Sequence, residues 1–294
     1  MLALGNFDGL HRGHRKILER LSRVAAERGA TPVVMTFDPH PPRVVRPDKA
    51  PALIMTKAQK LEGLELAGVH GAAIVRFTPE LSQWDPEMFV RTVLVDWLHV
   101  SEVWVGANFL FGRDRSGNFS LLRSLGARYG FKAEKIDPVR YKDFVVSSTR
   151  VRRLVSEARV DEASALLGHQ YFIDGMVVHG AERGRTIGFP TANLCSDNEL
   201  VPPHGVYATT VIIDGIVRPS ITNIGVRPTV DSAGKTTIET HIFDFDQDLY
   251  GLHIRLAFVQ RLRDERAFES LDALKAQIAA DCSRARVLFD RLSL

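Results

Sequence analysis

The sequence has little cysteine and no long hydrophobic run. Its 294 residues include two cysteines, Cys195 and Cys282, which are too few for a disulfide framework and are typical of a reducing compartment. No apolar stretch approaches the roughly 18 residues that a membrane-spanning helix needs. The first residues also lack the basic start and the small-residue cleavage site of a secretory signal. We therefore expect a cytoplasmic protein that does not span or bind a membrane.

An excess of charge of one sign is also absent. Lys and Arg number 38 against 35 Asp and Glu, so the formal net charge is only +3. This balance does not favour nucleic-acid binding, and it suits small anionic ligands better. With 45% hydrophobic and 25% charged residues the composition is that of a globular protein. The length is typical of two domains.

Apolar and amphipathic segments alternate in the first half of the chain. Strands are predicted at residues 2–4, 32–37, 72–75, 102–105 and 131–136. Helices are predicted at residues 13–28, 57–67, 86–98 and 119–129. This alternation is typical of a parallel sheet covered by helices, so we expect a doubly wound, Rossmann-like α/β domain.

The pattern changes to a period of two after residue 168. Strands are predicted at residues 171–178, 205–213, 217–222, 236–243 and 253–260, with turn residues such as Asp214-Gly215 between them. Such short strands predict a small closed antiparallel β-barrel. The last segment has apolar residues at helical spacing, which predicts a helix packed on the barrel. A polar, alanine-rich helix at residues 156–168 is expected to lead out of the first domain, and we predict domains of residues 1–168 and 169–294.

The segment Gly5-Asn6-Phe7-Asp8-Gly9-Leu10-His11-Arg12-Gly13-His14 joins the first predicted strand to the first predicted helix. A helix N-terminus offers unpaired N–H groups and a partial positive charge. His11 and His14 stand beside it and can donate hydrogen bonds to a phosphate, while the glycines let the backbone approach closely. The alternatives are a metal pair, which would need a third and a fourth ligand, or two surface histidines. We interpret the segment as an anion site.

Three further segments, two at strand ends and one at a helix start, complete a pattern. They are Thr36-Phe37-Asp38-Pro39-His40-Pro41, Val105-Gly106-Ala107-Asn108-Phe109-Leu110-Phe111-Gly112 and Ser147-Ser148-Thr149-Arg150-Val151-Arg152. With the opening segment they resemble, in order, the adenylyltransferase half of bacterial bifunctional riboflavin kinase/FAD synthetases. The resemblance implies that His11 and His14 are catalytic. It implies nucleotide or phosphate binding by Gly5, Phe7, Asp8, Gly9, Asn108, Ser147, Ser148, Thr149 and Arg150.

The sequence departs from the family pattern at two places. Family members often have Asp where this chain has Asn108, which removes a charge but keeps a hydrogen-bond acceptor. That change counts against a metal ligand at this position more than against a contact to flavin or nucleotide. Family members also usually carry a segment before the first strand. We therefore expect either an earlier start codon or a first strand that lacks one edge neighbour.

The second half carries its own set of segments. Gly180-Ala181-Glu182-Arg183-Gly184-Arg185-Thr186-Ile187-Gly188-Phe189-Pro190-Thr191-Ala192-Asn193 resembles the nucleotide loop and the Pro-Thr-Ala-Asn element of riboflavin kinases. Segments at residues 202–208, 223–229, 239–245 and 250–251 follow in family order. The resemblance implies nucleotide binding by Gly180, Gly184, Arg185, Thr186 and Gly188. It also implies that Thr191 and Asn193 are metal ligands and that Glu239 is catalytic.

The resemblance implies two ATP-dependent reactions that need Mg²⁺. Riboflavin is phosphorylated to FMN, and FMN is then adenylylated to FAD with release of pyrophosphate. The FMN phosphate is already ionised and needs no base, whereas the ribityl hydroxyl of riboflavin needs a proton acceptor such as Glu239.

Alternatives exist for Glu239 and for the whole chain. Glu239 and His241 should share one face of a strand and Thr240 the other, and we expect the carboxylate to face the barrel mouth. A buried structural glutamate is the alternative. For the chain, the alternatives are a flavin-binding module without chemistry and a monofunctional adenylyltransferase with a degenerate barrel.

Overall fold

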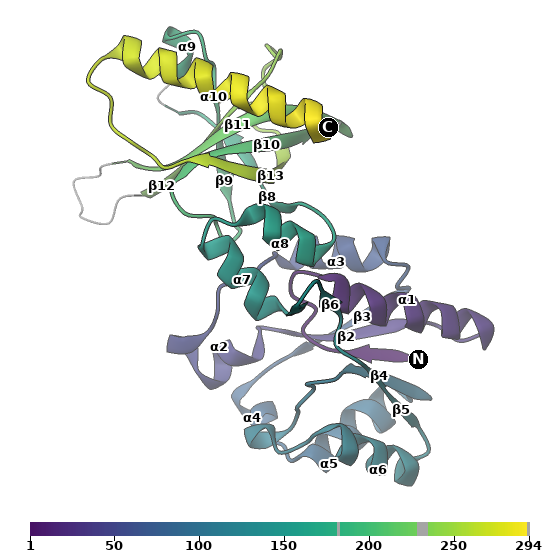
Figure 1. Cartoon of the computed structure of the whole chain (residues 1–294). Helices are drawn as coiled ribbons and strands as arrows, with labels where there is room; N and C mark the ends of the chain where they lie inside the picture. Colours follow the sequence, from purple (N-terminus) through teal and green to yellow (C-terminus); the bar gives the residue numbers. More distant parts are fainter. Residues whose placement is uncertain (181–182, 228–234, 293–294) are drawn as a thin grey trace. The chain divides into compact units, whose positions relative to one another are not determined.

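The chain folds into two compact units, Met1–Ser148 and Thr149–Leu294. The structure, a computed structural model, describes residues 1–180, 183–227 and 235–292 (Figure 1). Among these residues, no helix has both the length and the apolar character needed to cross a membrane.

The first unit is built on a five-stranded parallel sheet. Its strands are β1 (Leu2–Leu4), β2 (Val33–Asp38), β3 (Gly71–Arg76), β4 (Glu102–Gly106) and β5 (Lys132–Ile136), in the order β3-β2-β1-β4-β5. The predicted Rossmann-like α/β fold is thus confirmed. β1 is the central strand, with Leu4 opposite Met35 on β2 and Leu2 opposite Val103 on β4. The first strand therefore has neighbours on both sides, and the expectation that it could lack one is wrong.

Helices cover both faces of this sheet because the strand residues are apolar on both faces. Ala3 packs with Leu18 and Leu21 of α1 (Arg12–Glu27), on the face that α3 (Lys57–Leu66) also covers. Leu2 and Leu4 point the other way and pack with Val90 and Val93. That face is covered by α6 (Phe119–Tyr129) and by α5 (Pro86–Phe89), which continues as the π-helix η2 (Val90–Trp97).

Short elements fill the connections of the first unit, and the sequence pattern did not predict them. They are α2 (Pro41–Val45), η1 (Pro47–Lys49), α4 (Pro79–Ser82), η3 (Arg113–Arg115) and the hairpin β6 (Arg140–Tyr141) with β7 (Phe144–Val145).

The second unit contains a closed six-stranded barrel in the order β10-β11-β12-β9-β8-β13. Its strands are β8 (Tyr171–Val178), β9 (Ala192–Ser196), β10 (Gly205–Ile213), β11 (Ile216–Arg227), β12 (Lys235–Ile242) and β13 (His253–Arg263). The helices of this unit are α7 (Ser148–Ser156), which starts at the junction, α8 (Val160–Leu167), α9 (Arg183–Thr186) and α10 (Leu271–Leu292). The predicted barrel with a terminal helix is confirmed, and β9 is the strand that the pattern missed.

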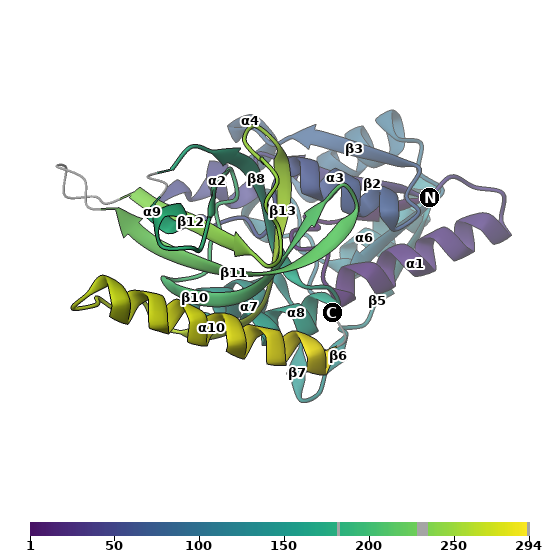
Figure 2. The same ribbon diagram turned by 90° about the horizontal axis from the view of Figure 1, so that it is seen from above.

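Different side chains line the inner and the outer face of the barrel. Inside lie the buried rings of Tyr171, Tyr207 and Phe258 together with a chain of hydroxyl groups. This chain joins Thr209 to Ser220 and Thr222 at 2.8 Å each and Thr222 to Thr240 at 3.0 Å. Outside, α10 runs along the wall (Figure 2). There Ala285 and Phe289 of α10 pack against side chains of three strands and of the residue that follows β12: Val206 (β10), Ile221 (β11), Val259 (β13) and Phe243.

The polar helix expected to leave the first domain belongs to the second unit. α8 packs against β8 and β13, and it buries Val160, Leu166 and Leu167. The hydroxyl of Ser164 also accepts a hydrogen bond from the backbone N–H of Tyr171 at 2.9 Å. The division into compact units falls at Ser148, so α8 is grouped with the barrel.

Candidate active sites

The loop between β1 and α1 lies at the carboxyl edge of the parallel sheet. It turns sharply, with positive φ angles at Phe7 (49°), Gly9 (86°) and Leu10 (38°). The end of β2 holds the start of the loop, because Thr36 Oγ1 donates to the carbonyl of Asn6 at 3.1 Å. β1 and β4 are neighbours at the point where the strand order reverses, which is where doubly wound folds bind their ligands.

The two histidines of the loop form one stacked pair at the start of α1. His11 is the N-cap residue, and its Nδ1 accepts a hydrogen bond from the backbone N–H of His14 at 3.3 Å. The ring centroids are 3.7 Å apart with planes 13° from parallel. A Cβ on Gly13 would come within 3.1 Å of the His11 ring, so glycine lets this ring fold over the helix end. Because Nδ1 accepts, Nε2 of His11 carries the proton and can donate.

His14 is held in its neutral form. Burial, followed by the nearby His11 and Lys60, places the pKa of His14 well below its usual range. Its Nδ1 is buried and has no hydrogen-bond partner among the residues described. At neutral pH this imidazole can therefore donate a hydrogen bond to an anion, but it does not bring a positive charge.

Asp8 has a buried carboxylate that faces the protein backbone. The backbone N–H of Ile54 donates to Oδ1 and Oδ2 at 3.1 Å each, and the N–H of Met55 donates to Oδ1 at 3.3 Å. The backbone carbonyl of Asp8 accepts from the hydroxyl of Ser148 at 2.8 Å. Asp8 and Ser148 thus fix the position of the loop by these contacts.

The other predicted residues of this set lie at several places. Gly5 donates its backbone N–H to the carbonyl of Met35 at 3.1 Å. Asn108 is exposed in the turn after β4, at the same edge of the sheet. Ser147 directly precedes α7. Thr149 and Arg150, in the first turn of α7, were also predicted to bind phosphate, and they belong to the second unit.

Two lysines of α3 also lie at this sheet edge, and they were not among the predicted site residues. Lys57 forms an ion pair with Asp38, the last residue of β2, with 3.0 Å between Nζ and Oδ2. Lys60 is half-buried and interacts electrostatically with Asp8, Asp38 and His14. Lysines on an amphipathic helix usually belong to its solvated face, so the sequence held no signal that would single them out.

In the barrel, three polar residues lie side by side on neighbouring strands. Glu239 on β12 is directly opposite Asn193 on β9 and Asn223 on β11. Residues directly opposite in antiparallel strands project to the same face, so the carboxylate lies between two carboxamides. Asn223 was not among the predicted site residues, because this neighbourhood depends on strand register that the sequence does not display.

The face that carries Glu239 is the outer face of the barrel. As predicted, Thr240 projects oppositely, and it is fully buried in the interior hydroxyl chain. Phe243, four residues after Glu239 along the chain, and Ile221, opposite His241, pack beside α10. The expectation that the carboxylate faces the barrel mouth is corrected, because the interior positions are filled by Thr240 and its partners.

The glycine-rich loop folds back onto Thr191 and Asn193. A Cβ on Gly180 would overlap Nδ2 of Asn193, and a Cβ on Gly184 would overlap the carbonyl of Phe189 and lie 3.2 Å from Oγ1 of Thr191. Gly188 has a φ of 87°, and Thr186 is exposed. The side chain of Arg185 and the residues Ala181 and Glu182 lie outside the described part of the chain.

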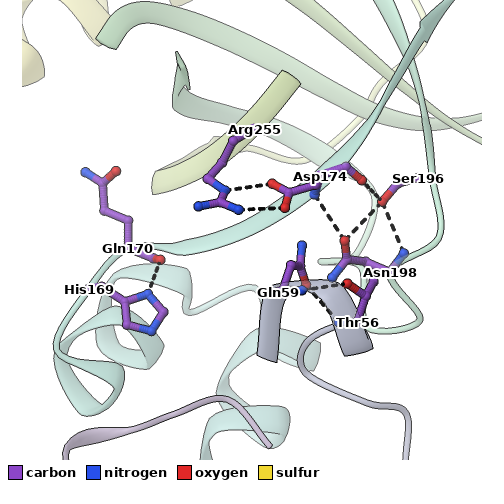
Figure 3. Close-up of polar contacts among 8 residues, drawn as sticks. All are labelled: Thr56, Gln59, His169, Gln170, Asp174, Ser196, Asn198 and Arg255. Carbon is purple, nitrogen blue, oxygen red and sulfur yellow. Dashed lines mark hydrogen bonds and ion pairs between the residues drawn. The ribbon is translucent and has the colours of Figure 1, made fainter. Parts of the chain in front are cut away.

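A polar network fixes β9, the strand that carries Asn193 (Figure 3). Asp174 on β8 forms a double ion pair with Arg255 on β13, with both N–O distances at 2.8 Å. The hydroxyl of Ser196 donates to the carbonyl of Asp174 at 2.6 Å, and the N–H of Asp174 donates to Oδ1 of Asn198 at 3.1 Å. β8, β9 and β13 are thereby tied together beside the site.

Both halves of the chain match known protein families. A family model described as FAD synthetase matches residues 1–150, and one described as riboflavin kinase matches residues 167–289.

Full-length relatives cover almost the whole chain. The bifunctional riboflavin kinase/FMN adenylyltransferase of Pseudomonas fluorescens is 42% identical over 97% of this chain and 91% of that protein. The protein of the same name from Escherichia coli K12 is 40% identical over 98% and 92%. A crystal structure described as a macrolide-efflux protein from Streptococcus pneumoniae is similar with a TM-score of 0.89 and 30% identity, over 97% of this chain and 93% of that chain. The chain belongs to the family of bifunctional riboflavin kinase/FMN adenylyltransferases.

Proposed function

We propose that this chain makes FAD from riboflavin in two successive reactions that each consume one ATP. The observation that carries the proposal is that each half of the chain matches its own family model. We assign the adenylylation to residues 1–168 and the phosphorylation to residues 169–294. We place both reactions in the cytoplasm because both consume ATP, and cell fractionation with an antibody against the chain tests this assignment.

The kinase reaction needs a proton acceptor. The 5′-hydroxyl of riboflavin attacks the γ-phosphorus of ATP, the bond to the bridging oxygen breaks, and ADP leaves. Glu239 is the base that takes the hydroxyl proton, because its carboxylate is half-buried between Asn193 and Asn223. Carboxamides beside a carboxylate can donate hydrogen bonds and hold it in one orientation.

The residues near Glu239 fit a magnesium ion bound to ATP. Oγ1 of Thr191 and Oδ1 of Asn193 are neutral oxygen ligands of the type that Mg²⁺ accepts together with phosphate oxygens and water. The two residues flank Ala192, so an extended backbone places them on one side. The close approach of Gly180 and Gly184 to these side chains brings the loop backbone to the same place. The ion would supply charge neutralisation of the phosphates.

The adenylylation needs anion binding but no base. A phosphate oxygen of FMN attacks the α-phosphorus of ATP, and pyrophosphate leaves with the electron pair of the broken P–O bond. Nε2–H of His11, an N–H of the neutral His14 and backbone N–H groups at the start of α1 are donors that stabilise charge on the phosphate oxygens. Asp8 and Ser148 act by holding this loop in place.

The test is incubation of the purified chain with riboflavin and Mg·ATP, followed by chromatographic separation of riboflavin, FMN and FAD. We expect FMN to appear first and FAD to follow. Accumulation of FMN without FAD would contradict the assignment of the first half. Formation of FAD only from supplied FMN would indicate a monofunctional adenylyltransferase with a degenerate barrel. Bound flavin without any product would indicate a flavin-binding module.

A further inference from the structure

α3 packs against the phosphate loop, and Lys60 lies on the face of the helix that meets the loop. A Cβ on Gly63 would overlap Cδ1 of Leu10. Leu64 is buried in the same cluster as Phe7 and Leu10. Lys60 precedes Gly63 by three residues and Leu64 by four, and residues at these spacings share one face of a helix. The side chain of Lys60 therefore starts from the loop-facing side of α3.

The ammonium group of Lys60 is placed among the charged and polar groups of the loop. It interacts electrostatically with the carboxylates of Asp8 and Asp38 and with the imidazole of His14. Burial lowers the pKa of Lys60, and the two carboxylates oppose this shift because they favour the charged form. The two carboxylates thus favour the protonated form of Lys60 in its half-buried position.

Neither carboxylate is committed to Lys60 as a structural partner. Asp8 accepts the backbone N–H groups of Ile54 and Met55, and Asp38 pairs with Lys57 at 3.0 Å. Across residues 1–180, 183–227 and 235–292, no ion pair or hydrogen bond is formed by the Lys60 side chain. A partly buried ammonium without a close partner is costly unless an anion binds to it.

We propose that Lys60 is a phosphate-binding residue of the adenylylation site, whose ammonium group contacts phosphate oxygens of ATP at the N-terminus of α1. This inference rests on the proposed function. ATP and FMN are both anionic and repel each other when they meet, and the stacked histidines donate hydrogen bonds but His14 brings no charge. A lysine at this position supplies the missing point charge, and it stabilises the pyrophosphate that gains charge as it leaves.

The experiment compares Lys60→Met and Lys60→Arg in the full chain. Lys49→Met is the matched control, because it removes the same charge from an exposed residue of η1. For Lys60→Met we expect kcat/KM for ATP in the conversion of FMN to FAD to fall on the order of a hundredfold. Riboflavin phosphorylation by the same sample should be unchanged. Lys60→Arg should regain part of the loss, and Lys49→Met should match the wild type.

Inhibition by added pyrophosphate distinguishes phosphate binding by Lys60 from a merely structural role. Lys60→Met should be inhibited only at pyrophosphate concentrations at least tenfold higher than the wild type. If Lys60→Met does not fold, Lys60→Gln takes its place in the comparison. Unchanged FAD formation, or an equal loss in both reactions, would overturn the assignment of Lys60. A wild-type chain that makes no FAD would overturn the proposed function itself, and the assignment with it.

Discussion

Asp8 provides the sharpest test of how the phosphate loop is held. Asp8 is 1% exposed, and its carboxylate accepts hydrogen bonds from the backbone N–H groups of Ile54 and Met55 at 3.1 and 3.3 Å. Asp8→Asn keeps one acceptor oxygen but presents an NH₂ group in place of the second. We therefore expect to lose about one hydrogen bond to a charged acceptor, or about 2 kcal/mol. Asp8→Ala leaves both N–H groups without their acceptor, which costs about 2–6 kcal/mol.

The assay uses the distribution of tryptophan in the chain. All three tryptophans, Trp84, Trp97 and Trp104, belong to the first unit, so thermal unfolding followed by tryptophan fluorescence reports on that unit. For a unit of this size a loss of 1 kcal/mol lowers Tm by about 2–4 °C, so Asp8→Asn should lower it by about 4–8 °C. Riboflavin phosphorylation by the same sample should be unaffected.

Asp38→Asn is the matched control for Asp8. It neutralises a carboxylate at the same sheet edge, but this one is 51% exposed and paired with Lys57, so its loss should cost less than about 1 kcal/mol. The reasoning is refuted if Asp8→Asn unfolds like the wild type and yet makes no FAD. Asp8 would then act on the substrate directly, as the family resemblance alone implied.

Three further predictions concern the second half. Glu239→Gln keeps the shape of the side chain but removes the proton acceptor, so riboflavin phosphorylation should fall about a hundredfold or more; conversion of supplied FMN to FAD, measured on the same sample, should persist. Gly180→Ala places a methyl group against Nδ2 of Asn193, so kinase activity should fall at least tenfold while FAD formation from FMN stays normal. Residues 149–294 should fold and phosphorylate riboflavin, whereas residues 169–294, which lack α8, should melt at a lower temperature by circular dichroism.

The sequence predicts most of the regular elements because their side-chain periods are strong. β1, β8 and β10 have the predicted bounds. In the sheet, the alternation of Leu2 and Leu4 with Ala3 distributes apolar side chains to two helical layers. Two elements were harder to place. β9 has only five residues, and buried and exposed positions do not alternate along it. The sequence of α8 looks polar, although Leu166 and Leu167 are buried on one side of the helix.

Site residues can be located by motif, but the direction of their side chains depends on tertiary contacts. Nothing local indicates that Asp8 turns to the backbone 46 residues later, since its acceptor role is set by where the chain before α3 passes. The pairing of Glu239 with Asn223 likewise depends on the register of β11 and β12. Lys60 was missed for the same reason, because only the packing of α3 brings it to the loop.

The two halves differ in how they use carboxylates, and the difference follows the chemistry of the two nucleophiles. Near the adenylylation loop, Asp8 is engaged with backbone N–H groups and Asp38 with Lys57. Both carboxylates thus have protein partners, and an ionised phosphate needs no proton acceptor. In the barrel, Glu239 lies between two neutral carboxamides, which can orient a carboxylate without neutralising its charge. A hydroxyl nucleophile requires such a group. The arrangement of the acidic side chains therefore matches a base-dependent phosphorylation in the second half and a base-free adenylylation in the first.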